Sequence, residues 1–134
     1  GAFVDARTTE QFESDSGTVA AGAPLPATPR WSGAGTLTHI GKIWGVSTAA
    51  SYMVSYRGES ANRLQNDIPL EAYVLHNISL NLGLRDRDLK PEINFSVTNL
   101  LDEAVSVFAL DTAGGVLRST NQPRTFLMTL SLSY

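Results

Sequence analysis

Residues 74–85 read Val-Leu-His-Asn-Ile-Ser-Leu-Asn-Leu-Gly-Leu-Arg, and this stretch decides the fold class. Apolar Ile78, Leu80 and Leu82 alternate with small or polar neighbours such as Ser79 and Asn81. Successive side chains of a β-strand point to opposite faces of the sheet. The stretch therefore predicts a strand with one apolar face and one polar face.

The same alternation recurs along the chain, while no window places apolar residues at helical spacing over several turns. It is regular in residues 44–57, 92–98 and 126–134, and less regular in residues 2–12 and 31–40. These runs are rich in Ser and Thr, which suits strands better than helix interiors. The sequence thus predicts an all-β chain of about six antiparallel strands.

The connections between these strands alternate in length. Those predicted at residues 41–43 and 86–89 are short; those at residues 14–30, 58–70 and 103–123 are long. Short periplasmic turns and long extracellular loops are typical of transmembrane β-barrels. Runs of about 10–13 residues also exceed the usual soluble strand and match the ~9–11 residues that cross a bilayer. The pattern predicts transmembrane strands; a soluble β-sandwich with one wet face per sheet is the alternative.

The last strand carries one further prediction. It ends with an aromatic residue in phase with four apolar ones. It thereby resembles the C-terminal assembly signal that outer-membrane barrels present to their insertion machinery, here Phe126, Met128, Leu130, Leu132 and Tyr134. An open strand edge cannot be satisfied in lipid, so this strand must pair with another in a closed barrel.

Several segments go further and resemble the C-terminal part of a TonB-dependent outer-membrane receptor. They are Leu-Pro-Ala-Thr-Pro-Arg-Trp-Ser at 25–32, Ile-Pro-Leu-Glu-Ala-Tyr at 68–73, an Asn-Leu-Leu-Asp turn at 99–102 and Gln-Pro-Arg-Thr-Phe at 122–126. The resemblance covers about residues 22–134, although the family usually ends in Phe rather than Tyr134. Asn99 and Asp102 are expected to bond nearby backbone and end a strand. Pro123 suits the start of the next strand, and Arg124 is expected to pair with an acidic group.

The resemblance implies that residues 1–134 are the C-terminal segment of a larger barrel, of about 22 strands with a plugged lumen. The plug and the earlier strands are absent from this chain, which would be a fragment, a proteolytic product or one subunit of a split receptor. The absence of a signal peptide at residues 1–5 is expected to reflect a removed N-terminus.

The resemblance also implies a function: active uptake of a scarce ligand, such as a ferric siderophore or cobalamin, across the bacterial outer membrane. The implied partners are the rest of the barrel, a TonB-type energy-transducing protein acting through the plug, membrane lipid and the barrel-insertion machinery. Loop residues that are candidates for facing an anionic ligand are Arg57, Arg63, Asp67 and Arg118. Each of these residues could equally be a solvated residue at the barrel rim. A passive, porin-like barrel is an alternative function, because only an upstream plug distinguishes an active transporter from a passive barrel.

Composition and motifs argue against several classes of partner and site. The 134 residues carry a net charge of −3 and no cysteine, so a nucleic-acid partner is not expected and disulfides are excluded. His39 and His76 are far apart, and no acidic residue completes a metal-ligand spacing. Neither a nucleophile elbow nor a phosphate-binding loop occurs. We therefore expect no metal, no cofactor and no enzymatic activity.

Overall fold

The computed structural model describes residues 1–14, 17–61, 68–84, 90–112 and 114–133. No residue in these ranges is helical, which confirms the all-β prediction. The chain divides into two units. The strand unit comprises residues 34–55, 75–103 and 122–134, and the loop unit comprises residues 1–33, 56–74 and 104–121.

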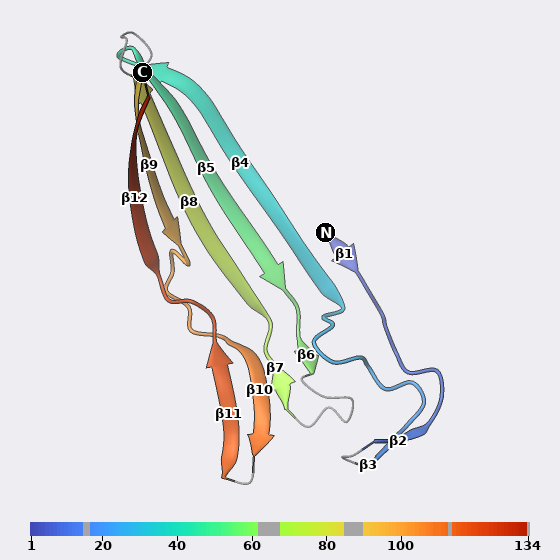
Figure 1. Ribbon diagram of the computed structural model, residues 1–134. Coiled ribbons are helices and arrows are strands. Elements are labelled where there is room, and N and C mark those ends of the chain that lie inside the picture. Colours follow the sequence, from blue (N-terminus) through green and yellow to red (C-terminus); the bar gives the residue numbers. More distant parts are fainter. Residues whose placement is uncertain (15–16, 62–67, 85–89, 113, 134) are drawn as a thin grey trace. The chain divides into compact units, whose positions relative to one another are not determined.

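The largest sheet has six strands in the order β1-β4-β5-β8-β9-β12, close to the predicted number. Its members are β1 (Ala2–Phe3), β4 (Trp31–Ile43), β5 (Val46–Arg57), β8 (Tyr73–Leu84), β9 (Lys90–Thr98) and β12 (Thr125–Ser133). The pairs β1–β4, β8–β9 and β9–β12 are antiparallel. Within the strand unit the long strands lie side by side, as Figure 1 shows.

One predicted strand and one predicted turn are wrong. Residues 2–12 do not form a continuous strand, because only Ala2–Phe3 joins the large sheet and residues 8–11 lie outside any strand. Residues 41–43 are the end of β4 rather than a turn, and Trp44 is in the turn rather than in the following strand. The turn predicted at residues 86–89 lies outside the described residues.

The observed β4–β5 turn has a conformation unusual for a large side chain. Trp44 has φ 49° and Gly45 has φ 81°, the positive pair found in two-residue type I′ hairpins. Glycine adopts this conformation freely, whereas a side chain with a Cβ atom loses about 1–2 kcal/mol in it. Trp44 is also 99% exposed, so little of the indole surface is covered by the chain.

The loop unit contains short hairpins within the predicted long connections. These are β2 (Phe12–Ser14) with β3 (Gly17–Val19), β6 (Ser60–Ala61) with β7 (Pro69–Leu70), and β10 (Ser106–Thr112) with β11 (Gly115–Thr120). Ile68, Leu70 and Ala109 form a small buried cluster, with Ala109 completely inaccessible to solvent. The loop unit thus has a core of its own.

Candidate functional surface

Backbone pairing aligns the apolar residues of three strands of the strand unit. Because cross-strand partners share a face, the register of β8, β9 and β12 produces continuous rows. The apolar rows are Ile78–Val97–Phe126, Leu80–Phe95–Met128 and Leu82–Ile93–Leu130. A single face of the sheet therefore presents nine large apolar side chains in adjacent positions.

The opposite face of these strands is small and polar. Its rows are Ser79–Ser96, Asn81–Asn94–Thr129 and Gly83–Glu92–Ser131, with Leu127 beside Ser96 as the one large apolar exception among these rows. Ser51 hydroxyl lies 2.8 Å from the Ser79 hydroxyl, which extends the polar face onto β5. We refer to these two surfaces as the apolar face and the polar face.

The apolar face is open to its surroundings. Ile78, Phe95 and Leu130 are 36%, 37% and 62% exposed, so the described part of the chain does not enclose them in a sealed core. Ring contacts follow the same face, with the Phe95 and Phe126 centroids 6.5 Å apart. An apolar surface this continuous on a soluble monomer marks an interaction site.

A hydrogen-bonded pair of rings lies beside the apolar rows, on the side of the long connections. The Tyr52 hydroxyl is hydrogen-bonded to His76 Nδ1, and the two rings stack with centroids 5.9 Å apart. His76 precedes Ile78 in the same strand parity, so polar groups replace aliphatic ones here along β8.

Asn99 organises the connection from β9 to β12, as predicted. It is 5% exposed and has φ 50°. Its side-chain Nδ2 donates to the carbonyls of Glu103 (2.9 Å) and Gln122 (3.0 Å), and its Oδ1 accepts from the Glu103 backbone N–H (3.1 Å). Its own backbone N–H donates to Asn77 Oδ1 at 3.0 Å. The expected strand-terminating role is confirmed.

Asp102 and Arg124 complete this junction, with one difference from prediction. Asp102 Oδ1 accepts a hydrogen bond from the Arg124 backbone N–H at 2.8 Å. The Arg124 guanidinium, however, contacts the Leu100 carbonyl at 3.5 Å and lies 5.8 Å from the centre of the Phe126 ring. Arg124 therefore contacts the acidic residue Asp102 through its backbone N–H and not, as predicted, through its guanidinium.

The predicted ligand-facing loop residues occupy separate places. Arg57, at the end of β5, donates from Nη2 to the Ala27 carbonyl at 2.8 Å. Arg118, exposed on β11, lies with Nη1 3.4 Å from the Ser106 hydroxyl. Arg63 and Asp67 lie outside the described residues. Of the assembly-signal residues, Phe126, Met128, Leu130 and Leu132 lie exposed on the apolar side of β12, and Tyr134 lies outside the described residues.

A hollow in the loop unit was not anticipated from the sequence. It has a volume of about 380 Å³, and Arg30, Trp31, Tyr56 and Glu59 are among the residues that line it. Gly58 allows the close approach there, because its N–H donates to the Trp31 carbonyl at 2.8 Å and a Cβ atom at this position would lie 2.8 Å from the same oxygen. An isolated Gly after a regular strand was the only sequence signal for this contact.

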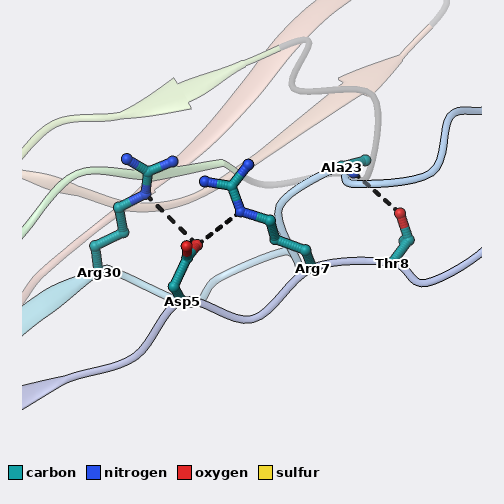
Figure 2. A network of polar contacts seen from close by, with 5 residues as sticks. All are labelled: Asp5, Arg7, Thr8, Ala23 and Arg30. Atoms are coloured by element: carbon teal, nitrogen blue, oxygen red, sulfur yellow. Dashed lines mark hydrogen bonds and ion pairs between the residues drawn. The ribbon is translucent and has the colours of Figure 1, made fainter.

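Figure 2 shows a second polar cluster in the loop unit, around Asp5. Asp5 Oδ1 is 2.9 Å from Arg7 Nε and 3.9 Å from Arg30 Nε. The hydrogen bond from Arg7 lowers the pKa of Asp5 below its ordinary value, and the same bond raises the pKa of Arg7. Beside it, the Thr8 hydroxyl accepts from the Ala23 N–H at 3.0 Å.

Two features are absent from the described residues. No three His, Cys, Asp or Glu side chains gather there as a metal site. None of the described residues form a helix long and apolar enough to cross a membrane.

Comparison with known proteins gives a likeness in fold. No protein-family model matches the sequence, and no curated protein matches it. The fold is similar to that of a solved structure, BauA, the ferric preacinetobactin receptor from Acinetobacter baumannii, with a TM-score of 0.68 over 84% of this chain. The chain spans 16% of the length of that receptor, and at 14% sequence identity the likeness concerns the fold alone.

Proposed function

We propose that this chain forms part of the wall of an outer-membrane β-barrel of the TonB-dependent receptor type. The complete barrel would take up a scarce ligand, such as a ferric siderophore or cobalamin. The observation that carries this proposal is the continuous apolar face of β8, β9 and β12, set against a face that is small and polar apart from Leu127. The fold likeness to a ferric preacinetobactin receptor supports the transport role.

A lipid bilayer is the environment that suits the apolar face. Each leucine-sized side chain gains about 1.5–3 kcal/mol on leaving water. Six of the nine side chains of this face are exposed, so the face is costly without a cover. The 12 residues of β8 extend about 40 Å, which at a tilt of about 45° matches a hydrocarbon core of about 30 Å. The polar face would line the lumen.

The edges of the sheet favour a larger barrel that continues beyond this chain. β12 is the last strand in the order and has β9 as its one neighbour there. On the other side, β1 pairs with β4 at Trp31 and Ser32 only, which leaves most of that edge of β4 without a strand partner among the described residues. Backbone groups exposed to hydrocarbon need partners, so further strands of the same barrel would supply them.

The remaining roles follow from this arrangement. The apolar residues of β12, together with Tyr134, would present the strand to the barrel-insertion machinery. A plug outside this chain would couple the barrel to a TonB-type energy-transducing protein. Of the two arginines, Arg118 is the stronger candidate for attracting an anionic ligand. Its contact with the Ser106 hydroxyl is 3.4 Å long, whereas Arg57 donates to the Ala27 carbonyl at 2.8 Å. The chain would act as wall and surface loop, without catalysis.

Uptake by the complete protein tests this function. Cells that express it should accumulate a labelled ferric siderophore or cobalamin, and a protonophore that collapses the inner-membrane gradient should abolish the accumulation. Arg118→Glu should raise the half-saturating concentration of an anionic ligand, whereas Arg118→Lys should not. Ligand entry that survives the protonophore would instead identify a passive barrel.

A further inference from the structure

The β4–β5 hairpin carries a patch of small and polar residues. A Cβ atom added at Gly41 would lie 3.2 Å from His39 Nε2 and 3.7 Å from Thr48 Oγ1, so both side chains stand on the same face as Gly41. Alternation along β5 places Ala50 on this face as well. We refer to these four residues as the small-residue patch.

The small-residue patch continues the apolar rows of β8. The Ser51 and Ser79 hydroxyls meet on the polar face. β5 and β8 are neighbours in the sheet and run in opposite directions, as Figure 1 shows, so this contact sets Thr48 beside Leu82. Because Leu82 belongs to the apolar face, Thr48 occupies a row in which the neighbouring strands carry large aliphatic side chains. In the proposed membrane location this row faces hydrocarbon.

Thr48 brings an unsatisfied polar group to the patch. It is 8% exposed, and its Oγ1 has no hydrogen-bond partner among the described residues. A buried hydroxyl without a partner is costly, and a lipid chain offers it none. His39 adds a second polar side chain beside it. These two groups favour a partner that supplies hydrogen bonds over a lipid chain.

We infer that the small-residue patch is the contact between two copies of the complete barrel within the membrane. Small residues let two backbones approach closely in a bilayer, and Thr and His side chains hydrogen-bond across such contacts between membrane helices. A side chain of the second copy that displaces the His39 ring from Gly41 reaches the Thr48 hydroxyl. The inference rests on the proposed function and adds a second copy of the protein to it as a partner.

The chemistry of the patch matches a copy of itself. A hydroxyl donates and accepts, and a neutral imidazole has one donor and one acceptor nitrogen, so Thr48 and His39 can each bond their counterparts. A two-fold axis along the membrane normal keeps both copies in one orientation and brings the two patches together at equal depth. This is the self-complementary arrangement of an isologous dimer, the commonest symmetric assembly.

Disulfide crosslinking of the purified complete protein in vesicles tests this contact, since residues 1–134 include no cysteine. On mild oxidation Ala50→Cys should give a covalent dimer. Leu130→Cys is the matched control, because it lies exposed on the same face outside the patch and should give severalfold less dimer. Thr48→Val and His39→Leu, introduced together, should reduce the Ala50→Cys dimer severalfold. Equal dimer yields at positions 50 and 130, or a yield that the double substitution leaves unchanged, would overturn the inference.

A lipid probe separates failure of the contact from failure of the membrane location. A nitroxide attached to Leu130→Cys should collide often with oxygen in vesicles. If it does and Ala50→Cys gives no dimer, lipid covers the patch and only the dimer contact is wrong. If the nitroxide does not collide with oxygen, the membrane proposal fails too. A crosslink to a protein of another size in native outer membranes, without a dimer in vesicles, would identify a different partner and overturn the second copy.

Discussion

The strand unit and the loop unit differ in how they bury apolar residues, although the loop unit also has exposed ones such as Phe108 (50%) and Leu117 (62%). The loop unit buries Ile68, Leu70 and Ala109 against one another and has Val19 at 2% exposure. The strand unit leaves Met128 and Leu130 72% and 62% exposed on one regular face. Short hairpins thus make an internal core, whereas the long strands depend on their surroundings to cover the apolar face.

This difference separates two kinds of sequence information. Alternation at a period of two shows which residues share one face of a strand, and it can be recognised from the sequence along a strand of any length. A core assembled from short hairpins depends on which distant residues meet. Substitutions in one unit at a time test this difference.

The largest effect is expected from a charge on the apolar face. Leu80→Arg should destabilise the complete protein in bilayers by about 2–4 kcal/mol, because the guanidinium would face hydrocarbon. Asn81→Arg, one position along on the polar face, should change stability by less than about 0.5 kcal/mol. Denaturant unfolding in vesicles measures both. Equal losses at the two positions would show that the faces are not in different environments.

The Asn99 junction is expected to give the next largest effect. Asn99→Ala removes two donated side-chain hydrogen bonds and one accepted bond in a nearly buried site, and should cost about 3 kcal/mol. Asn99→Asp keeps the acceptor for the Glu103 N–H but turns an oxygen toward the Glu103 and Gln122 carbonyls, so it should lose at least as much. Denaturant unfolding gives the free energies; an Ala variant as stable as the wild type would contradict this account.

Within the loop unit, Gly58 should be less tolerant than another glycine. A Cβ atom at Gly58 would lie 2.8 Å from the Trp31 carbonyl oxygen, whereas one at Gly114 meets nothing within 4 Å. Gly58→Ala should therefore cost about 1–3 kcal/mol. Gly114→Ala is the matched control and should be close to neutral. Thermal unfolding compares the two variants. A Gly58→Ala variant as stable as the wild type would contradict the close approach of Gly58 to the Trp31 carbonyl.

The smallest effect is expected at the exposed Asp5 cluster. Arg7 lowers the pKa of Asp5 below its ordinary 3.8. The stabilisation that the Asp5–Arg7 contact gives the loop unit is therefore present above that value and is lost as pH falls through the lowered pKa. Hydrogen exchange at Leu25 and Thr8, whose amides bond the Ala6 and Ala23 carbonyls, should accelerate over that acidic range. In Asp5→Asn the acceleration of exchange at low pH should disappear. If it persists, the titration of another group causes it.

Much of the strand unit could be predicted from the sequence, because its alternation is long. β5, β8, β9 and β12 follow the predicted runs closely. The β4–β5 turn was misplaced, since Trp44 continues the apolar parity of β5 and hides the turn that its positive φ reveals. Asn99 and Asp102 were recognised because short polar side chains bond nearby backbone.

The loop unit could not be predicted in the same way. β2, β3, β6 and β7 each have two or three residues, too few for a period to be visible. The cluster of Ile68 with Ala109 joins residues far apart in sequence, which no local pattern indicates. The hydrogen bond from Arg57 to the Ala27 carbonyl could not be predicted either, because it also joins residues far apart in the sequence.

A nitroxide scan of β8 in bilayers tests the central claim most directly, since the chain has no cysteine of its own. Labels at Leu80→Cys and Leu82→Cys should collide often with oxygen and rarely with a water-soluble nickel chelate. Labels at Ser79→Cys and Asn81→Cys should show the reverse preference, giving an alternation with a period of two. The account would be contradicted if labels at 80 and 82 reached neither collision partner, as in a sealed core, or reached the nickel chelate as readily as labels at 79 and 81.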